Sequence, residues 1–169
     1  MSIKRDDALA SVKFYLKDYL HDKRVLQMRS FIQHGNITTY THCLRVALIS
    51  YIICIKLNLN VSMSELLVGA LLHDYFLYDW HDGRQRPEGL HGFTHPKTAL
   101  INAECDFNLT ERERNIIYSH TFPMTITQVP KCKEAFVVCI ADKICATEET
   151  VTGFKNNITS LFNLRATNV

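Results

Sequence analysis

Hydrophobic positions recur with a helical period along most of the chain, and the alternation typical of strands is scarce. A first amphipathic segment covers about residues 7–33 and ends where His34-Gly35-Asn36 breaks the pattern. A second segment begins near Thr38 or Thr39, either of which can cap a helix, and runs to about Asn58. Because apolar positions nearly encircle this second segment, it predicts the most buried helix of the fold.

Residues typical of helix starts divide the rest of the chain. Two stretches have the spacing of a capping box, and they predict helices over about residues 62–74 and 110–120. Two further helices are expected over about residues 96–105 and 130–147, and each has a proline that fits the first helical turn. The chain therefore contains several separate helices of moderate length.

The remaining segments complete the predicted fold. Residues 79–94 are rich in Gly, Pro, Arg and His and predict a long loop, and a last short helix is expected over residues 155–164, with a frayed tail after it. A chain of 169 residues suits a single domain. We predict an all-α fold, a single compact helical bundle of about six to eight helices. Its core covers about residues 36–150, and the N-terminal helix packs on it.

Composition and charge narrow the classes of function. Apolar residues make up 47% of the chain and charged residues 21%, which is typical of a globular protein. A formal charge of +2 offers no basic excess for nucleic acid, and the longest apolar run, at residues 46–55, is too short to span a bilayer. Charges near the N-terminus argue against a secretion signal, and six cysteines without a C-x-x-C pair exclude a zinc ribbon. We expect a cytoplasmic protein with reduced cysteines that contacts neither nucleic acid nor a membrane.

Polar residues interrupt the predicted helices at positions that should be buried. His42 lies in the second helix, and Asp142 interrupts an apolar run. His73 and Asp74 follow a run of small and aliphatic residues. A buried aspartate is costly unless it is paired or bound to a metal. Imidazole nitrogens and carboxylate oxygens are ligands of first-row metals, so these residues explain one another if they surround divalent cations in a helical bundle.

The order of these residues resembles a known signature. His42, then His73-Asp74, then Asp142 is similar to the H…HD…D pattern of the HD-domain superfamily of metal-dependent phosphohydrolases. The segments T-H-C-L-R-V-A, L-V-G-A-L-L-H-D and I-A-D-K-I resemble the family's sequence around these residues, and the likeness covers about residues 38–150. The resemblance implies a bundle of HD-domain type and a metal-dependent hydrolase.

Two further histidines, His95 and His120, fall between the HD pair and the last aspartate, which is similar to the binuclear subgroup with the pattern H…HD…H…H…D. This resemblance implies a first ion held by His42, His73, Asp74 and Asp142, and a second ion held by Asp74, His95 and His120. Asp74 would bridge the ions and form the catalytic pair with His73. Whether one or two ions bind stays open, and the ligand types suit iron, manganese, cobalt, nickel and zinc alike.

Residues outside the ligand set are candidates for contacts with the substrate. Arg84, Arg86 and His91 lie in the predicted long loop. Lys143 directly follows a proposed ligand. The alternatives are solvated loop residues for the first three and a local ion pair for Lys143. Many binuclear members have a lysine three residues after the HD aspartate, where this chain has Leu77, so other groups must neutralise the phosphate or the substrate differs.

Other polar and aromatic residues have structural explanations. We expect His21 and His34 on the surface, and we expect Arg45 to form a structural ion pair with Asp74 or another carboxylate. The aromatic residues at positions 75–80 could stack on a base, but packing against the bundle is the favoured explanation.

The leading hypothesis is an enzyme that cleaves a phosphoester or phosphoanhydride bond in a nucleotide or another small phosphorylated metabolite, by a metal-activated hydroxide. One alternative is an HD-type di-iron oxygenase, which shares this ligand pattern. Another is a non-catalytic HD-derived binding module, which usually lacks some of the ligands. The pattern leaves the substrate and the oligomeric state open, and the amphipathic first helix would suit a homodimer.

Overall fold

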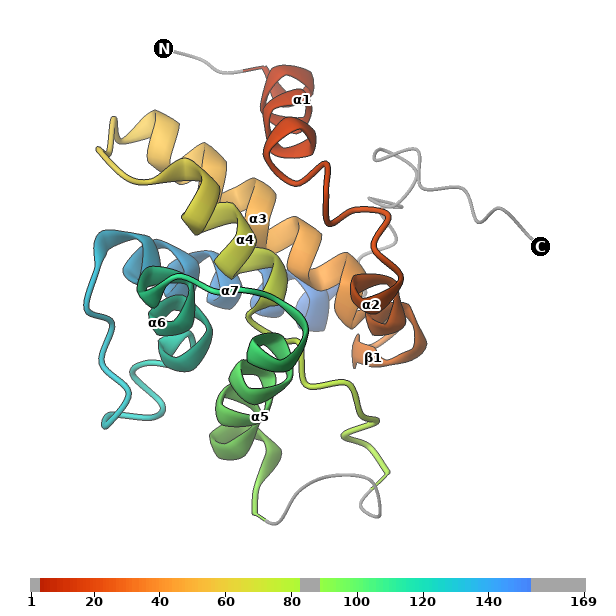
Figure 1. Ribbon diagram of the computed structural model, residues 1–169. Coiled ribbons are helices and arrows are strands. Elements are labelled where there is room, and N and C mark those ends of the chain that lie inside the picture. Colours follow the sequence, from red (N-terminus) through yellow and green to blue (C-terminus); the bar gives the residue numbers. More distant parts are fainter. Residues whose placement is uncertain (1–3, 83–88, 153–169) are drawn as a thin grey trace, which may run out of the picture.

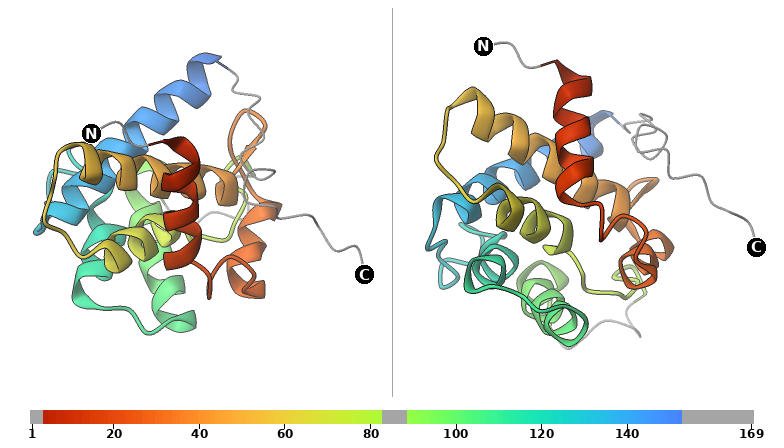
Figure 2. Two further views of the ribbon diagram at one scale, coloured as in Figure 1. Left: turned by 90° about the horizontal axis from the view of Figure 1, so that it is seen from above. Right: turned by 45° about the horizontal axis from the view of Figure 1, so that its top comes forward.

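α3 (Thr39–Lys56) is the central helix of the computed structural model, which describes residues 4–82 and 89–152 (Figure 1). Most of its side chains are buried, as its apolar pattern predicted. It packs on α4 (Met63–Leu72) and α7 (Lys133–Thr152), while α1 (Arg5–Tyr15) covers it on the side away from α7 (Figure 2). The hydrophobic core lies between these helices.

The N-terminal segment is not the single helix predicted over residues 7–33. After α1 the chain turns and forms the short helices α2 (Lys23–Leu26) and η1 (Gln27–Ser30). Asp22 explains the restart, because its carboxylate accepts a hydrogen bond from the backbone N–H of Arg24 at 2.8 Å and caps α2. The apolar spacing that predicted one helix instead buries residues of several short elements, and both α1 and η1 pack on α3.

A small β-hairpin follows, which the hydrophobic pattern did not predict. β1 (Ile32–His34) pairs antiparallel with β2 (Ile37–Thr38). Gly35, between the strands, has a φ of +54°, in the left-handed region that favours glycine. β1 packs against both α3 and α7, so the hairpin lies beside the centre of the fold.

α5 (His91–Asp106) begins earlier than predicted, and Pro96 lies inside the helix rather than in its first turn. Phe93 and Thr94, which precede the proline, both donate their backbone N–H groups to the carbonyl of Leu90, so a helical turn is already closed there. Pro96 has no N–H group, so the helix lacks one i→i−4 hydrogen bond at this position. The loop predicted over residues 79–94 is therefore shorter than expected.

The two capping-box patterns behave differently, although both mark helix starts. At α6 (Glu111–Ser119), the Thr110 hydroxyl accepts from the Glu113 N–H at 3.2 Å, and the Glu113 carboxylate accepts from the Thr110 N–H at 2.8 Å. This box is confirmed. At the start of α4, the Ser62 side chain caps no backbone N–H, so the second capping box does not form. The backbone N–H of Ser62 donates instead to the Glu134 carboxylate at 2.8 Å.

α7 starts three residues after Pro130 and runs past its predicted end near Thr147. Its last turns carry Glu148 and Glu149, which accept hydrogen bonds from the Arg45 guanidinium on α3 at 2.7 and 2.6 Å. This connection between helices explains why α7 continues beyond its apolar run. The helix predicted over residues 155–164 and the tail after it lie outside the described residues.

The described part of the chain contains seven α-helices, one 3₁₀ helix and a single two-stranded hairpin. This content confirms the predicted all-α fold of HD-domain type. Among the helices described, none is both long and apolar enough to cross a membrane.

Gly69 allows α4 and α6 to approach each other closely. A Cβ atom at this position would lie only 2.7–2.9 Å from three side-chain atoms of Ile116 on α6. Both helices end at a histidine, because His73 is the C-cap of α4 and His120 is the C-cap of α6. The centroids of these two rings are 4.8 Å apart. The contact between α4 and α6 therefore brings two candidate ligands together.

Candidate metal centre

The predicted polar residues converge where the ends of α4 and α6 meet α3, α5 and α7. The six side chains are His42 on α3, His73 and Asp74 at the end of α4, His95 on α5, His120 at the end of α6, and Asp142 on α7. Five of them are buried, and the side chain of Asp142 is 17% exposed. The structure thus brings all the candidate metal ligands into one cluster.

A first group of donors consists of His42, His73 and Asp142, whose ligand atoms lie within 4.8 Å of one another. The Asp142 Oδ1 atom lies 3.1 Å from Nε2 of His42 and 3.7 Å from Nε2 of His73. The Oδ2 atom of Asp74 faces the same nitrogens, at 3.8 Å from His42 and 3.3 Å from His73. These atoms surround a position that a cation could occupy.

A second group consists of Asp74, His95 and His120. The Asp74 Oδ1 atom lies 3.2 Å from Nε2 of His95 and 3.4 Å from Nε2 of His120. The two Nε2 atoms are only 2.8 Å apart. Asp74 therefore directs one carboxylate oxygen toward each group.

Three of the histidines are oriented by their own helices. Nδ1 of His73 donates to the carbonyl of Ala70, Nδ1 of His95 to that of His91, and Nδ1 of His120 to that of Ile117, at 2.7 to 2.8 Å. A carbonyl oxygen only accepts, so each Nδ1 carries a proton. In the neutral ring, Nε2 then has a lone pair directed into the cluster.

This protonation pattern fits a metal site. Two Nε2 lone pairs on His95 and His120 would repel each other at 2.8 Å, so either a proton shared by the two nitrogens or a cation bound to both relieves the contact. Nε2 of His73 and Oδ1 of Asp74 are buried and have no hydrogen-bond partner among the described residues. Unpartnered buried donors and acceptors are costly, and imidazole and carboxylate together suit divalent first-row metals. The donor set therefore fits divalent cations.

The model of one protein family, the HD domain, matches residues 39–147. The chain belongs to the HD domain family. The match covers more than half of the sequence, confirms the resemblance, and contains all six candidate ligands. A search of curated proteins found no match, and a search of solved structures also found none.

Glu149 is a functional candidate that the sequence pattern missed in this HD domain. Its Oε2 atom lies 2.9 Å from Nδ1 of His42, which is the fourth histidine of the centre. Arg45 holds the other oxygen at 2.6 Å, so the ion pair expected for Arg45 forms with Glu148 and Glu149 rather than with Asp74. A signal existed: Asp142 and Glu149 are seven residues apart, which is two turns on one helix face. The predicted helix end near residue 147 hid it.

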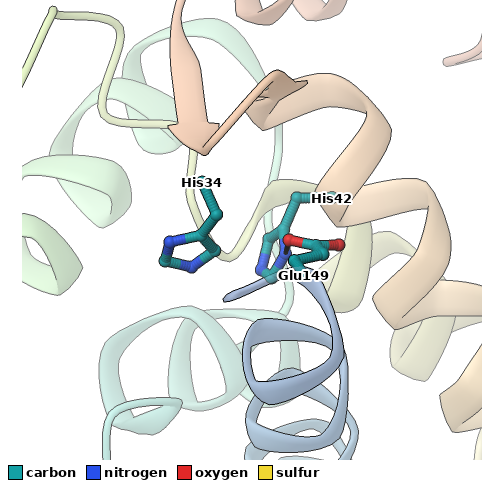
Figure 3. Close-up of side chains that lie close together, drawn as sticks. All are labelled: His34, His42 and Glu149. Atoms are coloured by element: carbon teal, nitrogen blue, oxygen red, sulfur yellow. Dashed lines mark hydrogen bonds and ion pairs between the residues drawn. The ribbon is translucent and has the colours of Figure 1, made fainter. Parts of the chain in front are cut away.

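The β-hairpin supplies two further neighbours of the centre. The Gln33 amide donates to Oδ2 of Asp74 at 2.6 Å, and the Thr39 hydroxyl, 3.4 Å from the amide oxygen, orients the amide. His34 is not the surface residue that we expected: it is half-buried, and its ring lies edge-on to His42 with centroids 5.6 Å apart (Figure 3). Neither residue could be placed from the sequence, because the hairpin itself gave no signal.

Charges in the centre shift the pKa values of its members. Burial disfavours the charged imidazole of His42, but hydrogen bonds with Asp142 and Glu149 outweigh burial and raise its pKa to about 10. Burial also disfavours the Asp74 carboxylate, yet the positive charge that His73 carries when no cation is bound, together with the nearby rings of His120 and His95, holds the pKa of Asp74 well below the usual value. The pKa of Asp142 is lowered in the same way against the effect of burial. Without a cation, the carboxylates are thus ionised, and His42 and His73, whose pKa values are both raised, carry the compensating positive charge.

Of the four predicted substrate contacts, two lie beside the second group of donors. The Lys143 ammonium donates to the carbonyls of His120 and Cys139 at 3.0 and 3.3 Å, so it lies beside the second group. His91 stacks on His95 with ring centroids 4.6 Å apart and shares a hydrogen bond with the Tyr78 hydroxyl at 2.9 Å. The two other predicted contacts lie outside the described residues: Arg84 and Arg86.

The aromatic residues after the HD pair pack within the protein. Tyr75, Phe76 and Tyr78 are buried. Trp80 lies near two histidine rings: His91 is stacked with centroids 5.0 Å apart, and His81 is tilted with centroids 3.9 Å apart. This arrangement favours the packing role over base stacking.

Proposed function

We propose that this HD domain is a metal-dependent phosphohydrolase, which cleaves a phosphoester or phosphoanhydride bond in a nucleotide or another small phosphorylated metabolite. The observation that carries the proposal is Asp74, a buried carboxylate with one oxygen facing each of two donor groups. One or two divalent ions would bind there, with iron, manganese, cobalt, nickel and zinc all compatible with the donors.

The geometry supports two ions. Each group has at least two nitrogen or oxygen donors besides Asp74, and the short distance between the Nε2 atoms of His95 and His120 would let one cation bind both. Paired ions that share a carboxylate are a common arrangement in enzymes that cleave phosphate bonds.

The chemistry supplied by bound ions is an activated water at neutral pH and positive charge for the phosphate oxygens. The chain's own residues prepare the place for it. His73, His95 and His120 present Nε2 lone pairs because backbone carbonyls hold their Nδ1 protons. Asp74 and His73 are the proposed catalytic pair, and Asp74 would orient the attacking water between the groups.

The path of the substrate follows from exposure. Asp142 has the most exposed side chain of the six, so we expect the phosphate to approach from its side. Lys143, the next residue, donates two of its three N–H groups to backbone carbonyls and could give the third to a phosphate oxygen. Arg84 and Arg86 remain proposed phosphate contacts. His91 contacts His95 and would hold that ring in place.

Metal analysis followed by activity measurements tests this function. We expect at least one ion per chain after loading, and release of phosphate from some nucleotides or sugar phosphates that stops when a chelator is added. Less than one ion per chain after careful loading would contradict the proposal and favour a binding module. Oxygen uptake by the iron-loaded protein without phosphate release would favour the di-iron oxygenase.

A further inference from the structure

Glu149 contacts a candidate metal ligand although it lies beyond the segment that the HD family model matches. Its side chain is fully buried, with Oε2 at 2.9 Å from His42 Nδ1 and Oε1 at 2.6 Å from Arg45 Nη1. A buried charge is tolerated only when partners satisfy it. One partner of Glu149 is the Arg45 guanidinium, and the other is the His42 ring, which faces the metal centre. The Glu149 carboxylate can therefore act directly on His42.

His42 differs from the other three histidines of the centre because a carboxylate lies at each of its ring nitrogens. Nδ1 faces Glu149, and Nε2 lies 3.1 Å from Oδ1 of Asp142. A neutral imidazole carries one proton, for which the two carboxylates compete. If Asp142 kept this proton, Nε2 would have no lone pair for a cation.

We propose that Glu149 is a positioning residue of the metal centre: it retains the Nδ1 proton of His42 and thereby presents the Nε2 lone pair to the first group of donors. Arg45 holds the Glu149 carboxylate in place. The inference rests on the proposed metal site and adds a residue from the C-terminal end of α7 to it. A carboxylate behind a metal-bound histidine orients the ring and increases its basicity.

A direct role of Glu149 as a ligand is the competing explanation. His34, His42 and Glu149 place possible ligand atoms within 4.8 Å of one another (Figure 3). A cation among them would have to replace the proton between His42 and Glu149 and would share its carboxylate with the Arg45 guanidinium. Both requirements disfavour a cation at this place, so positioning is the better explanation.

Glu148 provides a matched control. It precedes Glu149 on α7 and also accepts from Arg45, at 2.7 Å, but its side chain is 49% exposed and its described bond does not involve His42. Glu149→Gln and Glu148→Gln each remove one negative charge from the same ion-pair network. Only the first weakens the hold on the Nδ1 proton. We would measure the affinity of each purified variant for Zn²⁺ by competition with a chromogenic chelator.

We expect Glu149→Gln to weaken binding of one Zn²⁺ ion, the ion held by the first group, by about 10- to 100-fold, while Glu148→Gln stays close to the unmodified protein. Equal effects of the two substitutions would overturn the inference, since they would show a general electrostatic role. Unchanged affinity in Glu149→Gln would overturn it while leaving the proposed function intact. If the unmodified protein bound no Zn²⁺, the inference would be overturned, whereas the proposed function would fail only if none of the compatible metals bound.

A second measurement needs no variant. Long-range ¹H–¹⁵N spectra of the zinc-loaded protein report which nitrogen of each histidine carries the proton. We expect His42 to be protonated at Nδ1 and bound to zinc through Nε2. Zinc bound through Nδ1 would overturn the inference in favour of direct ligation, and so would the loss of one whole ion in both His34→Ala and Glu149→Gln.

Discussion

The two donor groups of the centre are built in different ways. In the second group, the rings of His95 and His120 are held by carbonyls four and three residues earlier in the chain. In the first group, His42 depends on Glu149, which is 107 residues away on α7. Local helix chemistry therefore prepares the second group, whereas the first combines one locally held ring, His73, with a second ring, His42, that requires α3 and α7 to pack correctly. Asp74 belongs to both groups and joins them.

Removing the Asp74 carboxylate should have the largest effect, because this side chain faces both donor groups. We expect Asp74→Ala to lower phosphate release by more than about 100-fold, the upper end of the loss seen for residues that merely support a ligand. Much of the bound metal should be lost as well, while helical content measured by circular dichroism stays close to normal. Turnover at the original rate would show that Asp74 is not in the active centre.

Substitution of one histidine in each group should separate them. We expect His95→Ala to lose the second ion and keep the first, and His42→Ala to do the reverse, because each ring faces only one group. Elemental analysis of the loaded variants measures this directly. If either change removed all bound metal, the two groups would act as a single site.

Crowding the contact between α4 and α6 should lower the free energy of unfolding and disturb the metal centre only indirectly. Gly69→Ala places a Cβ atom against Ile116, and overpacking of this kind costs about 1–3 kcal/mol of the free energy of unfolding. The clash outweighs the intrinsic helix preference of alanine, since three atoms of Ile116 are too close. Urea unfolding measures the loss.

A second substitution provides the control for this prediction. Ile116→Ala in the Gly69→Ala background removes two of the three crowded atoms, so the combined loss should be smaller than the sum of the two single losses. Strict additivity would indicate that the two residues do not meet.

Loss of the cap of α6 should have the smallest effect and spare the chemistry. Thr110→Ala removes a confirmed N-cap at the end of α6 opposite to His120, with an expected cost of about 1 kcal/mol in unfolding free energy. Metal affinity should not change, because the carbonyl of Ile117 still orients His120. Ser62→Ala is the matched control, since that side chain caps no backbone N–H, and we expect a smaller loss there.

The hydrophobic pattern predicted the helices that carry the ligands better than the segments that connect them. α3, α4 and α6 begin where capping residues and apolar periodicity indicated. The prediction of one helix over residues 7–33 was wrong, because a side-chain cap at Asp22 interrupts an otherwise helical spacing. The β-hairpin was missed because its two short strands have no detectable alternation.

By itself, the sequence determined the helical class and the set of polar residues that had to find partners, because six titratable side chains within apolar helices are too costly to bury separately. Only the tertiary structure decided which other residues form hydrogen bonds with these side chains. Gln33 reaches Asp74, and Glu149 reaches His42, through contacts between elements that are distant in the chain. Periodicity reports which face of a helix is buried, but the partner that a buried nitrogen meets depends on how the helices pack.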